Sequence, residues 1–175
     1  MAAQRALDRR RVILDAARAC FLQFGYAKTS LDDIAKRAGL SRPLLYRMFK
    51  NKEDIYGAVY DDLFDAQYPI AARALTGRGS RRDKLLRVCE AVIVEPWQVV
   101  MNGPMAREFY DACSRVAPEV LAKHERKLAE LVREVLGNRD LTEVFLCAME
   151  GLMMDVPTST VLRKRLAVLV DRFAS

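Results

Sequence analysis

The sequence predicts an all-helical fold of about nine helices. Apolar residues recur every three or four positions through most of the chain, which is the spacing of one face of an α-helix. No stretch alternates apolar and polar residues convincingly, as a half-buried strand does. Helix starts such as Ser30 and stops such as Gly39 also divide the chain into segments of ordinary helix length.

Three helices are predicted in the first third of the chain. The first, over 8–24, carries its apolar residues on one stripe and is stopped by a glycine. The second, over 30–39, starts with a capping box formed by Ser30 and Asp33. The third follows almost at once, over 41–49, and has a proline in its first turn, where a missing amide hydrogen costs little.

Six more helices are predicted over residues 51–75, 80–96, 104–115, 118–136, 141–156 and 160–173. Pro69 is expected to kink the first of these, because the residues after it resume a helical composition. The loop 77–80 is the clearest break between the basic N-terminal part and the remainder.

Composition narrows the protein class. The 175 residues suffice for one ordinary domain, or for a small module joined to a larger one, and 51% of them are hydrophobic. The longest uncharged stretch, Pro96–Ala106, is shorter than the roughly 18 apolar residues of a membrane span. Asp15 and Arg18 also interrupt the region where a signal peptide would need its apolar core. We therefore expect a folded cytoplasmic protein without a membrane partner.

Catalytic and metal sites are not expected. The four cysteines lie 24 to 69 residues apart, which is not the spacing of a zinc or redox motif, and buried thiols are the simplest interpretation. The single histidine, His124, lies in a strongly charged run, where no partner for catalysis can be identified. No cofactor and no enzymatic activity are therefore predicted.

Positive charge is concentrated at the N-terminus. Residues 1–52 hold 12 Lys and Arg against 4 Asp and Glu, a net charge of +8, whereas residues 53–175 hold 17 against 19, a net charge of −2. Such a local excess is the footprint expected for a polyanionic partner. A solvated basic surface is the alternative.

The third predicted helix has two different faces. At 100° per residue, Leu45 and Phe49 fall on one side, and Pro43, Tyr46 and Arg47 fall on the other. A presented face about 12 Å long that carries Arg and Tyr fits the major groove of DNA, where Arg reads guanine and Tyr contacts phosphate. The two short helices, over about 30–49, are therefore predicted to form a helix-turn-helix.

A dense set of motif residues runs from Ile13 to Tyr56. It comprises Ala16-Ala17, Phe21, Gly25-Tyr26, Thr29, Ile34-Ala35, Ala38-Gly39-Leu40-Ser41, Leu45-Tyr46, Phe49 and Asn51-Lys52-Glu53-Asp54. In these residues the chain resembles the DNA-binding domain of the tetracycline-repressor (TetR) family. The remainder is similar to that family only in length, helix count and order. The expected domains are a DNA-binding domain over 1–52 and a helical ligand-binding and dimerisation domain over 53–175.

The resemblance also implies roles for individual residues. Those expected to face bases are Arg42, Pro43, Leu44 and Arg47. Those expected to hold phosphates are Thr29, Ser41, Tyr46, Lys50 and Lys52. The basic arm over 5–11 is expected to be a tail, with phosphate or minor-groove contact as the alternative.

The last two predicted helices offer a homodimer interface. Residues 144–156 are apolar almost all round, so a helix there must be covered on more than one side. We expect these two helices to pair with their copies as a four-helix interface across a two-fold axis, which the resemblance also implies. The expected interface residues are Ala148, Gly151, Leu162, Leu166, Leu169, Val170 and Phe173. An ordinary intramolecular core is the alternative.

Flexible and aromatic side chains gather around a region that Pro and Gly interrupt. They are Trp97, Met101, Met105, Phe109, Tyr110, Cys113, Met149 and Met153. Such side chains can line a pocket for a largely apolar small-molecule effector, which the sequence does not identify. Core packing is the alternative for each of them.

The expected function is that of a ligand-responsive transcriptional repressor, a homodimer that binds double-stranded operator DNA until a small molecule binds it. The alternative is a non-catalytic helical interaction protein that binds RNA or acidic partners through its basic module. Competition with bulk duplex separates the two, because only a sequence-specific DNA binder prefers its own site.

Overall fold

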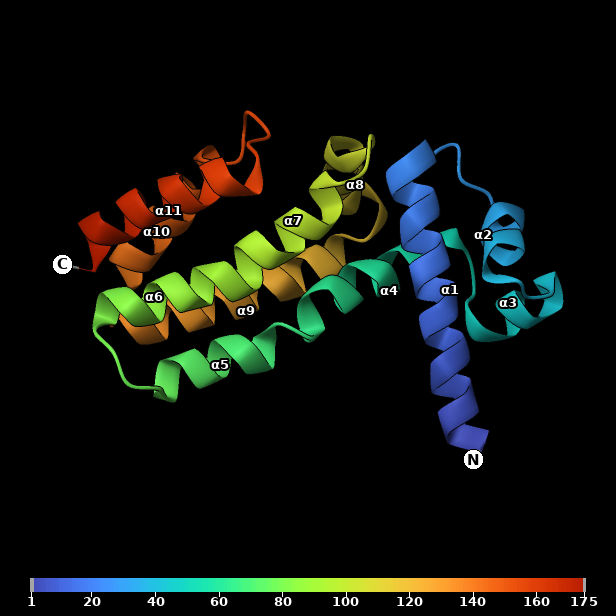
Figure 1. Cartoon of the computed structure of the whole chain (residues 1–175), viewed down its shortest axis with the longest axis horizontal. Coiled ribbons are helices and arrows are strands. Elements are labelled where there is room, and N and C mark those ends of the chain that lie inside the picture. The colour runs from blue at the N-terminus through green and yellow to red at the C-terminus, as the bar shows by residue number, and fades with distance from the viewer. Residues whose placement is uncertain (1, 175) are drawn as a thin grey trace. The chain divides into compact units, whose positions relative to one another are not determined.

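The structure is a computed structural model that describes residues 2–174 and the side chains of 4–174. These residues form eleven α-helices, one π-helical segment and no strand (Figure 1). The segments are α1 (Ala2–Phe24), α2 (Leu31–Ala38), α3 (Arg42–Met48), α4 (Lys52–Asp65), α5 (Tyr68–Thr76), α6 (Arg81–Cys89), η1 (Glu90–Val94), α7 (Glu95–Met101), α8 (Ala106–Val116), α9 (Pro118–Leu136), α10 (Arg139–Gly151) and α11 (Ser159–Phe173). The all-helical prediction is confirmed. Within the described range no helix is both long and apolar enough to span a bilayer.

Two interruptions explain why about nine predicted helices correspond to twelve segments. The helix predicted over 51–75 is divided into α4 and α5, and Pro69 lies in the first turn of α5. The kink expected at Pro69 is therefore wrong, and the chain breaks between two helices instead, because proline is tolerated in a first turn but removes a main-chain hydrogen bond from a helix interior. The helix predicted over 80–96 continues through α6, η1 and α7, where η1 is a π-helical turn that the sequence pattern does not reveal.

The described chain divides into two compact units. The first contains the residues up to 62 together with 102–121, and the second contains 63–101 together with those from 122 onward. This division differs from the boundary predicted after residue 52, because the first part of α4 packs with α1 and α8. The assignment of 1–52 to DNA binding concerns function and stays a prediction.

An aromatic cluster joins α1, α4 and α8 in the first unit. Tyr56 of α4 is fully buried, and its ring centroid lies 5.3 Å from that of Phe21 and 5.1 Å from that of Phe109. Its hydroxyl donates to the main-chain oxygen of Phe109. Burial raises the pKa of Tyr56, so the phenol stays protonated and the hydrogen bond persists. The cluster therefore fixes the start of α4 against the two helices beside it.

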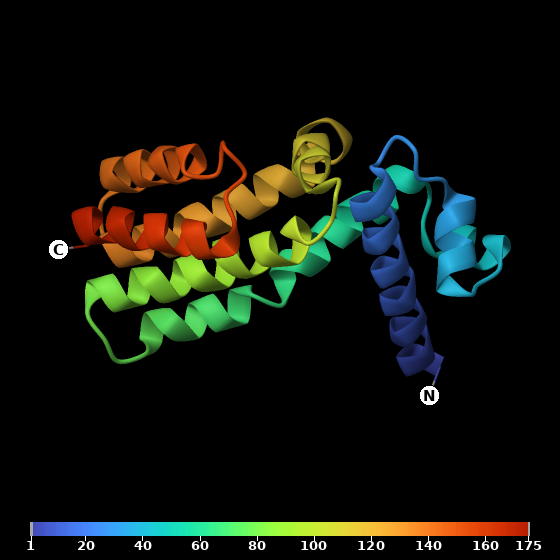
Figure 2. The same cartoon turned by 45° about the horizontal axis from the view of Figure 1, so that its top comes forward.

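The second unit is built around the continuous helical run α6–η1–α7. Helix α11 packs against all three of these segments, and α10 packs against α11 (Figure 2). Trp97 is 6% exposed, and its indole Nε1 donates to the main-chain oxygen of Pro157 at 2.8 Å. Three of the four cysteines are buried thiols as expected, but Cys147 of α10 is exposed.

Three residues predicted for a dimer interface lie in the core of the second unit. Leu162, Leu166 and Val170 are at most 2% exposed, because α11 packs against its neighbours in the same chain. They cannot contact a partner subunit, so the prediction is wrong for these three. Leu169 is half-buried, and so is Phe173, whose ring centroid lies 5.4 Å from that of Phe145.

The chain passes very close to α1 at Gly103. The amide of Met105 donates to the main-chain oxygen of Leu22 at 2.9 Å. A Cβ atom on Gly103 would lie 2.6 Å from the Cβ atom and 2.8 Å from the main-chain oxygen of Leu22. Only a residue without a side chain fits this approach.

We predict that Gly103→Ala destabilises the protein. The added methyl group must push the 102–105 turn away from α1, and such overpacking costs about 1–3 kcal/mol of unfolding free energy. Chemical denaturation followed by circular dichroism measures this change. An unchanged denaturation midpoint would show that the turn can move at no cost.

Candidate nucleic-acid interface

Helices α2 and α3 form the helix-turn-helix, and local signals define both. The side chain of Ser30 accepts from the Asp33 amide at 3.1 Å, and the Asp33 carboxylate accepts from the Ser30 amide at 2.9 Å. These bonds satisfy free amides at the start of α2. The helix ends at Gly39, whose φ of +66° lies in the left-handed region that favours glycine. Ser41 then precedes α3, and its side chain makes no capping hydrogen bond.

Helix α3 buries one face and exposes the other, as the helical wheel predicts. Leu45 is 1% exposed, and Phe49, directly after the helix, is 3% exposed. Pro43, Tyr46 and Arg47 are exposed on the opposite face. The helix has 7 residues, so it is about 10 Å long. This length is suited to the major groove of DNA.

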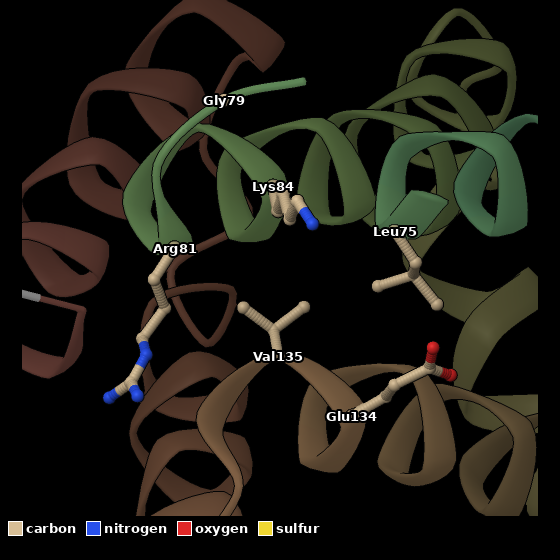
Figure 3. A pocket seen from close by; sticks show the side chains of 6 residues that line it. All are labelled: Leu75, Gly79, Arg81, Lys84, Glu134 and Val135. Atoms are coloured by element: carbon tan, nitrogen blue, oxygen red, sulfur yellow. The ribbon is translucent and has the colours of Figure 1, made fainter. Parts of the chain in front are cut away.

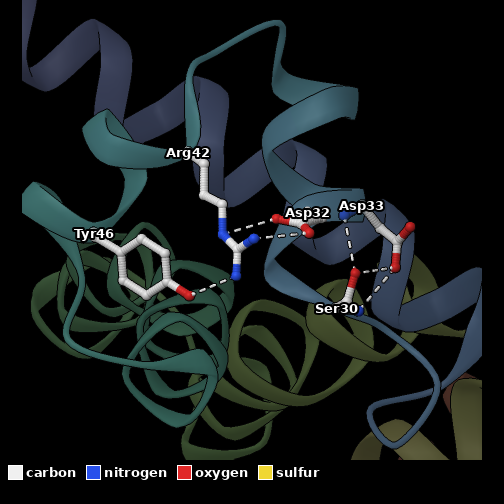
Figure 4. Close-up of polar contacts among 5 residues, drawn as sticks. All are labelled: Ser30, Asp32, Asp33, Arg42 and Tyr46. Atoms are coloured by element: carbon white, nitrogen blue, oxygen red, sulfur yellow. Dashed lines mark hydrogen bonds and ion pairs between the residues drawn. The ribbon is translucent and has the colours of Figure 1, made fainter.

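The guanidinium of Arg42 is held by two neighbours (Figure 4). Its Nε lies 3.0 Å from Oδ1 of Asp32, and its Nη1 donates to Oδ2 of Asp32 at 3.2 Å. Its Nη2 donates to the Tyr46 hydroxyl at 3.3 Å. The hydrogen bond to Tyr46, and then the charge of Asp32, raise the pKa of Arg42 above its ordinary value, so the guanidinium stays charged. Sequence reasoning missed Asp32, because no spacing rule links it to a residue ten positions later.

The remaining predicted residues around α3 differ in exposure. Ser41 and Lys50 are exposed, whereas Leu44 is half-buried on the flank of the helix. The main-chain amide of Lys50 donates to the Asp54 carboxylate at 3.0 Å. This bond fixes the backbone of Lys50 two residues after the end of α3.

Lys52 and Thr29 are predicted to contact phosphate, but both side chains form hydrogen bonds within the chain. The Lys52 ammonium donates to the main-chain oxygens of Tyr26 and Thr29 at 2.8 and 2.9 Å. It also lies 4.2 Å from the centroid of the Tyr26 ring. Thr29 is 2% exposed, and its hydroxyl donates to the main-chain oxygen of Gly25 at 2.7 Å. Both side chains therefore hold the α1–α2 loop, and a direct phosphate contact is contradicted for Thr29 because its side chain is buried.

Tyr26 is itself fixed in this loop. Its hydroxyl donates to the Glu53 carboxylate at 2.6 Å, and its amide donates to Glu108 at 3.0 Å. The hydrogen bond from Tyr26 lowers the pKa of Glu53, so this carboxylate stays ionised beside Lys52. The loop thus has contacts to both α4 and α8.

The basic N-terminal arm is helical. Residues 5–11 belong to α1, and Arg5, Arg9, Arg10 and Arg11 are exposed. The guanidinium carbon of Arg10 lies 4.8 Å from the centroid of the Phe49 ring. The expected tail is therefore wrong, because α1 starts earlier than the apolar stripe indicates.

The residues predicted to line an effector pocket are divided between the two compact units. Met105, Phe109, Tyr110 and Cys113 belong to the first unit, and Trp97, Met101, Met149 and Met153 belong to the second. Phe109 and Cys113 are fully buried, and Trp97 and Met149 are nearly so. For these four, the packing favours the core alternative.

Two pockets of the second unit are lined by other residues. One, of about 600 Å³, is lined by Gln67, Ile70, Arg73, Ala74, Arg87, Glu90, Ala91 and Glu95. The other, of about 310 Å³, has α6 on one side and α9 on the other, and is lined by Leu75, Gly79, Arg81, Lys84, Glu134 and Val135 (Figure 3). Both volumes lie in the range of small-molecule sites, roughly 300–1,000 Å³.

We predict that Lys52→Met lowers the unfolding free energy by about 1–3 kcal/mol, because two main-chain oxygens lose a charged donor. Lys50→Met is the matched control and should change it by less than about 0.5 kcal/mol, since Lys50 is exposed. Urea denaturation measures both. Equal effects of the two substitutions would refute the structural role of Lys52.

The chain is similar to a family profile in its first part and to two bacterial regulators over more than half of its length. Residues 13–59 match the family profile described as bacterial regulatory proteins, tetR family. The uncharacterised regulator TtgW of Pseudomonas putida is 31% identical over 107 residues, which are 61% of this chain and 73% of TtgW. The uncharacterised regulator YhgD of Bacillus subtilis is 26% identical over 128 residues, which are 73% of this chain and 67% of YhgD. Both are described as HTH-type transcriptional regulators.

Solved structures of TetR-family regulators have a similar fold. The solved structure of SCO4454, a TetR-family transcriptional regulator from Streptomyces coelicolor, matches with a TM-score of 0.73 at 19% identity, over 95% of this chain and 94% of that one. This likeness concerns the fold, whereas the profile match and the coverage of TtgW concern the sequence. Together with the exposed face of α3, they identify the chain as a member of the TetR family of DNA-binding transcriptional regulators.

Proposed function

We propose that this regulator is a homodimeric repressor that inserts α3 into the major groove of an operator and leaves the operator when a small molecule binds. The observation that supports this most is the exposed face of α3, with Pro43, Tyr46 and Arg47 beside the paired Arg42. Because the partner is DNA, the protein acts in the cytoplasm. Blocking the access of other proteins to the same duplex is the simplest effect of such binding.

The residues of α3 divide into two roles in this proposal. Arg42, Pro43, Leu44 and Arg47 face base edges, where an Arg fork suits the two acceptors of guanine. Ser41, Tyr46 and Lys50 hold phosphates and set the register of the helix in the groove. Lys52 supports this surface indirectly, by holding the α1–α2 loop.

The proposed dimer interface uses the exposed apolar side of α10 and α11. Leu141, Val144, Ala148 and Gly151 follow one another at helical spacing on α10, and only Ala148 of these is half-buried. Val161 and Val168 are 39% and 61% exposed on α11. A Cβ atom on Gly151 would meet nothing within 4 Å in the same chain, which leaves room for a partner helix. A two-fold pairing of these helices would cover the apolar side of both subunits.

The second unit is proposed to bind the effector, with the 600 Å³ pocket as the first candidate site. Its lining combines Ile70, Ala74 and Ala91 with charged side chains. The π-helical segment η1 contributes two lining residues, and π-helical turns are frequent at functional sites. An effector shifts the equilibrium only as far as its affinity differs between the DNA-bound and free conformations.

Selection from a pool of random duplexes tests the proposal. The wild-type protein is expected to enrich one two-fold symmetric sequence with half-sites about one helical turn apart. Arg47→Ala should relax base preference at one position in each half-site, by about 1–3 kcal/mol. Enrichment of no sequence, together with equal binding of RNA and DNA, would favour the alternative interaction protein.

We predict that Tyr46→Phe weakens binding to the selected duplex while leaving the fold intact. Tyr46 is 46% exposed, so the packing of its ring does not depend on the hydroxyl. The substitution removes the proposed phosphate bond, worth about 1–2 kcal/mol, together with the hydrogen bond that Arg42 donates to the hydroxyl. Fluorescence anisotropy gives the affinity, and a thermal melt provides the control for folding. An unchanged affinity would show that the Tyr46 hydroxyl does not contact DNA and that its assignment to the DNA-binding surface is wrong.

The proposed interface predicts that Val168→Glu separates the subunits. The valine is 61% exposed in one subunit, so a glutamate is tolerated there, whereas in the dimer two carboxylates are buried without partners. Lys164→Glu, an exposed position on the same helix, is the control for the added negative charge. Sedimentation velocity should show a monomer for the first variant only. A stable Val168→Glu dimer would place the interface elsewhere.

A further inference from the structure

Asp32 is an acidic residue beside the surface proposed to read DNA. Both of its carboxylate oxygens face Arg42, at 3.0 Å from Nε and 3.2 Å from Nη1 (Figure 4). Both side chains are well exposed, Arg42 by 58% and Asp32 by 61%. A negative charge in the first turn favours the start of α2, but it would repel any phosphate that DNA binding brings close to it.

The ion pair is not explained by the needs of the fold. The capping box of α2 is formed by Ser30 and Asp33, and the place of Asp32 in the first turn favours the helix start whether or not Asp32 pairs with Arg42. Exposed ion pairs add little to stability, typically less than about 1 kcal/mol. The main consequence of this ion pair is therefore its effect on the position and charge of Arg42.

Arg42 links Asp32 to Tyr46, because it pairs with the first and donates a hydrogen bond to the second. Arginine has five N–H donors and no acceptor, so the Tyr46 hydroxyl must accept the hydrogen bond from Nη2. The phenolic hydrogen is then left to point elsewhere, and Tyr46 meets the duplex as a donor. Phosphate oxygens, guanine O6 and N7, adenine N7 and thymine O4 accept such a bond, whereas the amino group of cytosine does not.

The same pair limits binding to any duplex. A free arginine at the start of α3 can attach to whichever phosphate is nearest, which adds affinity without selectivity. Asp32 neutralises this charge locally and occupies one edge of the guanidinium. Arg42 then adds binding free energy only where an acceptor on the DNA meets one of the N–H groups that Asp32 and Tyr46 leave unused.

We propose that Asp32 is a positioning residue that determines DNA specificity: it keeps Arg42 from indiscriminate phosphate binding and, through Arg42, presents Tyr46 as a hydrogen-bond donor. The inference rests on the proposed function, since it assumes that α3 reads DNA. It adds a residue of α2 to the reading surface that the residues of α3 alone do not reveal.

Three substitutions test the proposal. Asp32→Asn keeps the shape and one oxygen but removes the charge, and Asp32→Glu keeps the charge. Asp15→Asn is the matched control, because Asp15 is also exposed and pairs with an arginine, Arg18, but lies on α1. Each variant is titrated with the duplex that the wild type selects from the random pool and with a scrambled duplex of the same composition, over a series of salt concentrations.

We expect Asp32→Asn to bind the scrambled duplex several-fold more tightly and to lose about tenfold in the ratio between selected and scrambled duplex. Its salt dependence on the scrambled duplex should steepen by about 0.9 per subunit, the slope of one added phosphate contact. Asp32→Glu should keep the wild-type ratio, because it keeps the negative charge beside Arg42, and Asp15→Asn should also leave the ratio unchanged.

A double-mutant cycle separates this role from a general effect of charge. In an Arg42→Gln background, Asp32→Asn should no longer change the ratio or the salt slope, because no guanidinium is left to release. Unchanged binding by Asp32→Asn in the wild-type background would overturn the inference, and so would an equal effect with and without Arg42. A wild-type protein that selects no sequence would instead disprove the proposed function.

Discussion

The burial of the apolar side of α3 is the constraint on which the whole reading surface depends. A helix of 7 residues is too short to be stable alone, so packing must hold it. Leu45 and Phe49 supply that packing, and their burial leaves Tyr46 and Arg47 on the outside. The cluster around Tyr56 fixes the next helix along the chain in the same unit. Exposure of the polar residues is thus a consequence of where the apolar ones are buried.

Local rules account for the part of the fold that the sequence predicts well. The capping box at Ser30, the left-handed glycine at Gly39 and the two faces of α3 each depend on residues within one or two turns of helix. Contacts between distant segments are harder to foresee. Lys52 binds main-chain oxygens, which every residue possesses, so no pattern of side chains announces the contact. Asp32 and Arg42 lie on different helices, and their pairing depends on the angle between them.

The helices at the C-terminus show a different limit. A helical wheel identifies a continuous apolar stripe on α11, but it cannot tell whether a helix of the same chain or of a partner covers the stripe. Here Leu162, Leu166 and Val170 are covered within the chain. The exposed valines Val161 and Val168 form a second, shorter apolar set on α11, which can be told from the first only by the burial of those three residues.

The contact between Lys52 and the α1–α2 loop has a consequence for the substitutions that this part of the chain tolerates. Because the acceptors are the main-chain oxygens of Tyr26 and Thr29, these two hydrogen bonds do not require particular side chains in the loop. Substitutions at the exposed loop positions Ala27 and Lys28 can therefore accumulate without loosening the loop, as long as the backbone path and the lysine persist. Because this attachment of the loop lies outside α3, the exposed residues Pro43, Tyr46 and Arg47 can be exchanged together without disturbing it.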